Sequence, residues 1–106
     1  MDAEQLQGIA FEIILGSGDA RNLVHESFKF MRESDFEAAE KKLDEANESL
    51  LKAHGSQTGL LHKFAGGEAM EIDILMVHAQ DHLMTTMTLR EMALEMMFLY
   101  QKLDKK

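Results

Sequence analysis

Apolar and small residues recur along residues 6–30 in alternating steps of three and four. The positions are Leu6, Ile9, Ile13, Gly16, Ala20, Leu23, Ser27 and Phe30. This spacing is typical of one face of a helix. Two glycines inside a helix cost about 1 kcal/mol each relative to alanine, but the register continues unchanged across Gly16 and Gly18. The pattern therefore predicts one long first helix.

Two further segments carry the same alternation. A second helix is predicted after Ser34, because Ser34 and Glu37 form a capping-box pattern. Its core positions are Phe36, Ala39, Leu43, Ala46, Leu50, Ala53, Gln57, Leu60 and Phe64. The residues Ala65, Gly66 and Gly67 then interrupt the pattern. A third helix follows, with core positions Ile72, Leu75, Ala79, His82, Thr86, Leu89, Ala93, Met96, Tyr100 and Leu103.

The pattern as a whole predicts an all-α fold. No alternation typical of strands competes with the helical spacing. We expect residues 1–106 to form a single domain of three long antiparallel helices, an up-down bundle with coiled-coil-like packing.

The third helix has more apolar surface than two neighbouring helices can cover. One flank beside its core positions carries Met76, Leu83, Met87, Leu94 and Met97, and the other carries Ile74, Met92 and Leu99. A helix that is apolar nearly all round is normally buried nearly all round. We expect the chain to self-associate through the arc from Ile74 through Leu83 to Leu94 and Met97. The alternative is a docking groove for another protein, because methionine is common at adaptable surfaces.

Composition narrows the chemistry and the partners. The chain has no cysteine, so disulfides, a cysteine nucleophile and a thiolate metal site are excluded. Its formal net charge of −8 argues against nucleic acid or an anionic membrane as a partner. The first residues carry no basic region, and no run of 18 apolar residues occurs. We therefore expect a cytoplasmic protein without membrane insertion.

The candidate chemistry lies in the third helix. His78, Asp81 and His82 are spaced i, i+3 and i+4, so they share one face. Such a set suits a zinc or iron site, general acid and base catalysis, or a nucleophilic histidine that carries a phosphoryl group. A ferritin-like di-metal bundle is not expected, because no histidine has a glutamate three residues before it. The other histidines, His25, His54 and His62, are expected at the surface.

The segment from Val77 to Thr86, VHAQDHLMTT, resembles the active-site segment of a known family. The family is the enzyme IIA component of the lactose/cellobiose branch of the bacterial phosphoenolpyruvate-dependent sugar phosphotransferase system. The resemblance covers nearly the whole chain. Similar residues elsewhere are Gly18, Asp19, Ala20, Arg21, Ala53, His54, Gln57, Thr58, Gly66, Gly67 and Glu68. Ala79 makes the segment more similar to the cellobiose, lichenan and chitobiose members than to the lactose members.

The resemblance implies a specific activity. His78 would accept a phosphoryl group from the phosphohistidine of HPr and pass it to a cysteine of the IIB component, for uptake of a β-disaccharide through the membrane-embedded IIC component. Since a phosphoryl group that must leave again is best held by neutral or weakly cationic donors, Gln80 and His82 are the candidate contacts. A non-catalytic trimeric interaction or regulatory module with the same fold is the competing interpretation.

The resemblance also implies an assembly. Members of this family are homotrimers in which the third helices meet around a three-fold axis, so the chain would form a nine-helix bundle. The residue at the position of Asp81 binds a metal ion shared by three subunits. Three adjacent carboxylates need a counter-charge, so we expect Mg²⁺ or a similar divalent cation with a structural role.

Overall fold

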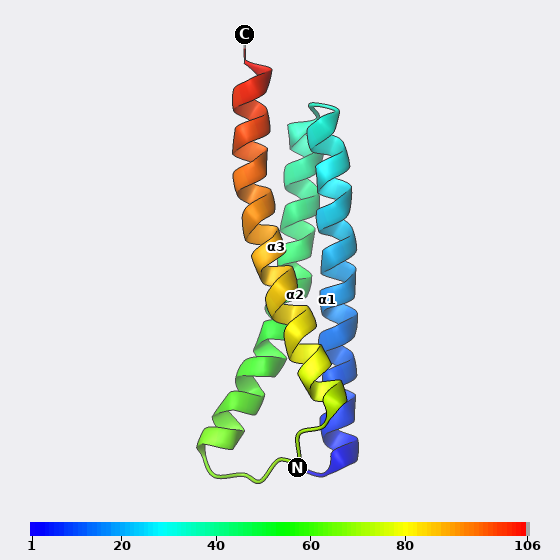
Figure 1. Cartoon of the computed structure of the whole chain (residues 1–106), viewed down its shortest axis with the longest axis vertical. Coiled ribbons are helices and arrows are strands. Elements are labelled where there is room, and N and C mark those ends of the chain that lie inside the picture. The colour runs from blue at the N-terminus through cyan, green and yellow to red at the C-terminus, as the bar shows by residue number, and fades with distance from the viewer. Residues whose placement is uncertain (106) are drawn as a thin grey trace.

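The computed structural model describes residues 1–105 and consists of three helices that run up, down and up (Figure 1). Helix α1 spans Ala3–Arg32, α2 spans Phe36–Ala65 and α3 spans Ile74–Asp104. The bundle measures 58 Å along its longest axis and 20 Å across. The predicted all-α, three-helix fold is confirmed, and α1 continues through Gly16 and Gly18 as expected.

The core follows the predicted stripe of α2 at Ala39, Leu43, Ala46, Leu50, Ala53 and Leu60. In α1 the prediction is confirmed at Leu6, Ile13, Ala20 and Ser27, but Ala10, Val24 and Met31 are buried where Ile9, Leu23 and Phe30 were predicted, and those three are half-buried. The buried apolar residues of these helices are Leu6, Ala10, Ile13, Ala20, Val24, Met31, Ala39, Leu43, Ala46, Leu50, Ala53 and Leu60. Gly16 permits a close approach between the two helices: a Cβ atom there would lie 3.3 Å from Ala53 Cβ and 3.4 Å from the Ser49 carbonyl oxygen. Close packing against α2 thus explains Gly16 in the interior of α1.

The turn between α1 and α2 differs from the predicted capping box. Ser34 belongs to the end of α1, where its φ of 60° is left-handed. The amide of Asp35 donates to the Phe30 carbonyl and that of Ser34 to the Met31 carbonyl, which is the hydrogen-bond pattern of a Schellman motif. Asp35 caps α2 instead, because its carboxylate accepts a hydrogen bond from the Ala38 amide. The predicted cap was therefore one residue too early.

The face that α3 presents to the core matches the prediction in part, because Ala79, Thr86 and Ala93 are buried as predicted. Leu83 and Met97, assigned above to the self-association arc, are 0% and 6% exposed and belong to the core of the subunit. Ile72 and Leu103, predicted as core residues, are exposed. The other predicted flank, Ile74, Met92 and Leu99, is exposed, and so are Val77, Met84 and Phe98. The predicted arc was wrong in its Leu83 and Met97 portion, because those side chains fill the space against the other helices.

One buried hydroxyl makes a testable contribution to stability. Ser17 Oγ is fully buried and has no hydrogen-bond partner within residues 1–105. A buried polar atom without a partner is unfavourable, so Ser17→Ala should raise the free energy of unfolding by about 1 kcal/mol. Urea denaturation at a fixed protein concentration measures this change.

Ser27 provides the matched control for that measurement. It is equally buried, but its Oγ donates a hydrogen bond to the Val24 carbonyl at 2.6 Å. Ser27→Ala should therefore give no gain in stability. Equal effects of the two substitutions would show that the Ser17 hydroxyl is satisfied in solution.

Candidate functional site

The predicted site residues lie near the beginning of α3. Asp73 caps this helix, since its carboxylate accepts a hydrogen bond from the Met76 amide at 3.0 Å. The cap fixes where the helix starts and hence which way the next turns point. His78 and His82 then lie side by side, with ring centroids 5.9 Å apart and an interplanar angle of 64°. The structure thus brings together the two imidazoles that the spacing predicted.

The two imidazoles have different surroundings. His78 is exposed, whereas His82 is partly buried. His82 Nδ1 lies 3.4 Å from Thr86 Oγ1, and the Thr86 hydroxyl donates its proton to the His82 carbonyl at 2.7 Å. Because that proton is used, a hydrogen bond between ring and hydroxyl requires Nδ1 to be the donor. His82 is therefore held in place, and His78 is the imidazole accessible to a reaction partner.

Asp81 lies on the exposed side of α3. None of the ion pairs formed within residues 1–105 includes its carboxylate. The neighbouring hydroxyl of Thr85 donates to the Asp81 carbonyl at 2.7 Å, and that of Thr88 donates to the Met84 carbonyl at 3.2 Å. Both hydroxyls are thus bonded to their own helix, and the Asp81 carboxylate is free to act as an oxygen ligand.

A single chain does not hold a metal site in the part that the structure describes. No group of three or more histidine, cysteine, aspartate or glutamate residues within residues 1–105 is arranged to bind an ion. The zinc or iron site considered from the spacing of His78 and His82 is therefore absent from one described chain. The carboxylate chemistry of Asp81 fits a hard divalent cation, but one carboxylate needs ligands from other chains.

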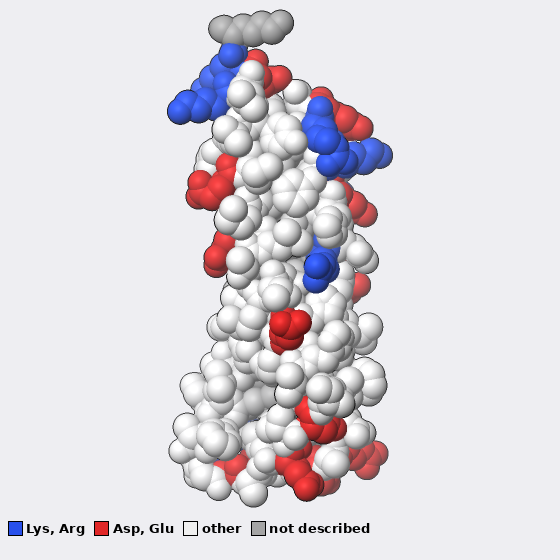
Figure 2. Space-filling view, viewed as in Figure 1, with Lys and Arg blue, Asp and Glu red and all other residues white. Residues whose placement is uncertain are grey.

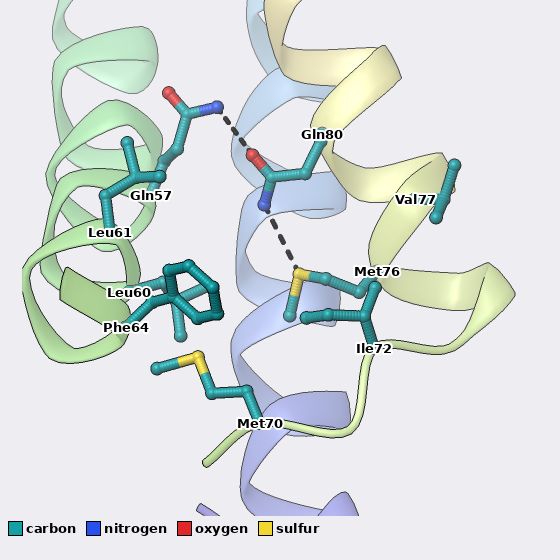
Figure 3. A pocket seen from close by; sticks show the side chains of 9 residues that line it. All are labelled: Gln57, Leu60, Leu61, Phe64, Met70, Ile72, Met76, Val77 and Gln80. Atoms are coloured by element: carbon teal, nitrogen blue, oxygen red, sulfur yellow. Dashed lines mark hydrogen bonds between the residues drawn. The ribbon is translucent and has the colours of Figure 1, made fainter. Parts of the chain in front are cut away.

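Gln80 points away from His78. Residues two apart in a helix do not face each other, and the side chain of Gln80 turns toward α2. There its Oε1 accepts a hydrogen bond from Gln57 Nε2, and its Nε2 lies 3.3 Å from the Met76 sulfur (Figure 3). Of the two predicted contacts to a phosphoryl group, only His82 is therefore near His78 in the same chain.

An apolar cleft opens between the end of α2, the connecting loop and the start of α3 (Figure 3). It has a volume of about 410 Å³ and is lined by Gln57, Leu60, Leu61, Phe64, Met70, Ile72, Met76, Val77 and Gln80. The hydrophobic pattern of the sequence does not predict this cleft. A signal was present, however, because Gln57 is a polar residue at a core position of α2, where it requires a hydrogen-bond partner across the interface.

Charge is distributed unevenly along the bundle. On the face shown in Figure 2, acidic side chains lie at both ends and along the sides, whereas basic side chains lie only away from the end where α3 begins. The connecting loop before α3 contributes Glu68 and Glu71 to that end, together with the capping Asp73. Much of the surface between the two ends carries no charge (Figure 2). The charge pattern therefore favours a basic, partly apolar protein surface as the partner of this end. Among the described residues, no helix has the length and apolar character needed to cross a membrane.

The sequence matches the family model described as the lactose/cellobiose-specific IIA subunit of the phosphotransferase system over residues 8–101. The chain belongs to this family. It is 46% identical to the lichenan-specific phosphotransferase enzyme IIA component of Bacillus subtilis, over 96% of this chain and 93% of that protein. The resemblance identified from the segment around His78 is thus confirmed.

Solved structures agree with this assignment. PtcA from S. mutans is 61% identical and superimposes with a TM-score of 0.94, covering 95% of this chain and 99% of that one. The IIA chitobiose component of Escherichia coli, solved in complex with HPr, is 36% identical with a TM-score of 0.78, covering 94% of this chain and 97% of that one. The three-helix fold is therefore the fold of this family.

Proposed function

We propose that the chain is a phosphocarrier in which His78 accepts a phosphoryl group from phospho-HPr and donates it to a cysteine of the cognate IIB component. The observation that carries this proposal is the exposed imidazole of His78 beside the held ring of His82. The Escherichia coli relative was solved with HPr, which supports HPr as the donor. The acidic end of the bundle near α3 also suits a basic partner surface (Figure 2).

The transfer consists of two balanced displacements. In the first, a neutral nitrogen of His78 attacks phosphorus, a new N–P bond forms, and the N–P bond to the histidine of HPr breaks. In the second, the thiolate of the IIB cysteine attacks the same phosphorus, an S–P bond forms, and His78 is released as a neutral imidazole. No oxidant or further reactant is needed in either step.

His82 is the proposed contact to the phosphoryl oxygens within the same chain. A weakly cationic or neutral donor stabilises the transferred group without trapping it. Gln80 cannot take this role in its own chain, because its amide faces α2 and Gln57. Its proposed role is therefore to supply an amide to the site of a neighbouring subunit.

The proposed assembly is a homotrimer with α3 innermost, a nine-helix bundle. Ile74, Met92 and Leu99 are among the exposed apolar residues of α3, and Asp81 is exposed as well. If these residues face a three-fold axis, three Asp81 carboxylates come together beside apolar contacts. Mg²⁺ or a similar divalent cation would there supply the positive charge that three adjacent carboxylates require.

The proposed cargo is a β-disaccharide of the cellobiose, lichenan, chitobiose or lactose type. The relative from Bacillus subtilis is lichenan-specific, and the Escherichia coli relative belongs to the N,N'-diacetylchitobiose branch. In the proposed pathway the IIA chain passes the phosphoryl group to IIB and does not contact the sugar, which crosses the membrane through IIC.

Phosphorylation by purified components tests the carrier function. Incubation of the full chain with phosphoenolpyruvate, enzyme I and HPr should add one phosphoryl group per chain, read as a mass increase and located on His78 by fragmentation. Omission of HPr is the control and should leave the mass unchanged. A chain that accepts no phosphoryl group from phospho-HPr would instead be a non-catalytic interaction module.

A further inference from the structure

The last turns of α2 separate from α3. The two helices diverge toward the connecting loop, and the apolar cleft occupies the space between them (Figure 1, Figure 3). Leu60, which also lines the cleft, is buried, but Leu61 and Phe64 are 60% and 67% exposed. On the other wall of the cleft, Ile72 and Val77 are 57% and 53% exposed. Four large apolar side chains therefore line a cleft that is open to solvent.

The exposure of Phe64 contradicts its place in the helical pattern. Phe64 continues the alternation that passes through Leu43, Leu50 and Leu60, all of which are buried. Its position on the core face of α2 means that its side chain would be buried if α2 followed α3 to the end. Phe64 thus provides apolar surface that would be buried if the cleft were closed.

The segment just before these residues is a poor helix former. Residues 54–59 read His-Gly-Ser-Gln-Thr-Gly, and of these only glutamine has a high helix propensity. A Cβ atom at Gly55 or Gly59 would meet no atom within 4 Å, and within residues 1–105 the glycine with positive φ is Gly67. Neither close packing nor a left-handed backbone explains the two glycines. Each of them makes this part of α2 easier to bend.

A polar contact spans the cleft at the level of this weak segment. Gln57, in the middle of residues 54–59, donates a hydrogen bond to Gln80 of α3. Gln80 also contacts Met76, a buried residue of α3. These contacts therefore tie α2 to α3 at Gln57, where the two helices begin to diverge. The chain beyond Gln57 lacks any such bond to α3 within the described residues, so bending there does not break this contact.

We propose that residues 60–65 form a hinged arm, and that bending within residues 54–59 closes the apolar cleft by bringing Leu61 and Phe64 onto Ile72 and Val77. Closure removes apolar surface from water on both walls, which favours it, whereas the open arm presents that surface beside Val77, the neighbour of His78. Closing the arm therefore buries the apolar surface next to His78, the proposed phosphoryl acceptor, and opening the arm exposes that surface. The inference does not depend on phosphoryl transfer, because it concerns the conformation of the unphosphorylated chain.

Disulfide trapping tests the closure directly. The chain has no cysteine, so Phe64→Cys combined with Val77→Cys introduces the only two thiols. A disulfide requires the two Cα atoms to come within about 7 Å, so an intramolecular bond reports the closed arm. Under mild oxidation this double variant should form an intramolecular disulfide. Phe64→Cys with Leu99→Cys is the control and should form none, because Leu99 lies near the other end of α3.

Stiffening the hinge should slow the trapping. Gly55→Ala and Gly59→Ala find open space and favour the helix by about 1 kcal/mol each, which corresponds to about a fivefold lower population of bent hinge per substitution. The disulfide should therefore form about fivefold more slowly with either substitution. Gly18→Ala is the matched control, because it also finds open space but lies in α1, and it should leave the rate unchanged.

Amide hydrogen exchange provides a second readout without cysteines. The amides of residues 58–63 should become about fivefold better protected in Gly55→Ala and in Gly59→Ala, and should not change in Gly18→Ala. Three results would overturn the proposal: no disulfide between positions 64 and 77, disulfides only between separate chains, or equal exchange in all of these variants. The second of these would show that another copy of the chain covers the cleft.

Discussion

His78→Ala should abolish phosphoryl acceptance while leaving the bundle folded. The imidazole is exposed, and none of the side-chain hydrogen bonds in the described residues involves it, so its removal should change the free energy of unfolding by less than about 0.5 kcal/mol. Loss of the reaction should be complete, because the alanine side chain has no nitrogen with which to form the N–P bond. Mass spectrometry after incubation with phosphoenolpyruvate, enzyme I and HPr measures the loss.

Two further histidine variants define the specificity of that result. His82→Ala removes a proposed donor to the phosphoryl oxygens and should slow acceptance about 100-fold without abolishing it. His62→Ala is the matched surface control, since His62 is exposed near the end of α2, and it should be phosphorylated like the parent. Phosphorylation that persists in His78→Ala but disappears in His82→Ala would assign the acceptor role to His82.

The bundle was predictable because its first two helices are amphipathic. In α1 and α2 the apolar residues occupy one face, so the alternation determines both the helix and the face that is buried, as Ile13 and Leu43 illustrate. The site could be predicted in part for the same reason. Helical spacing alone places His82 one turn after His78, and the two rings are indeed adjacent.

The orientation of α3 could not be predicted from its own pattern. This helix is apolar nearly all round, so several faces compete for the core, and the packing of α1 and α2 decides among them. Leu83 and Met97 are buried although the pattern placed them on a flank, whereas Leu103, which the pattern placed in the core, is exposed. The same limitation applies to Gln80, whose direction depends on the presence of Gln57 across the interface.

The open cleft could not be predicted from the sequence either, for a different reason. Phe64 continues the apolar alternation of α2 without interruption, so the pattern predicts burial up to the connecting loop. Whether two helices stay in contact depends on their relative angle, which no local pattern encodes. The weak helix propensity of residues 54–59 indicates a segment that bends easily, but not the direction in which α2 leaves the bundle.

Asp81→Leu should abolish metal binding at the proposed three-fold axis and strengthen the trimer. In the parent chain three carboxylates meet there and repel one another unless a cation balances their charge. Leucine at the same exposed position of α3 replaces this repulsion by apolar burial, which contributes about 2 kcal/mol per chain. Sedimentation at several protein concentrations, with and without Mg²⁺ and chelator, measures the effect. The parent trimer should weaken in chelator, and the Asp81→Leu trimer should be insensitive to it.

Asp81→Asn separates charge from apolar burial in this experiment. The amide keeps the size and polarity of the side chain but removes its charge, so the trimer should also lose its sensitivity to chelator without the full gain given by leucine. The apolar residues Ile74, Met92 and Leu99 on the same side of α3 are unchanged in both variants, so the interface stays comparable. A parent trimer whose stability is the same with Mg²⁺ and with chelator would show that no cation is shared at the axis. A well-folded parent monomer at micromolar concentration would contradict the trimer itself, because the exposed side of α3 would then be stable in water.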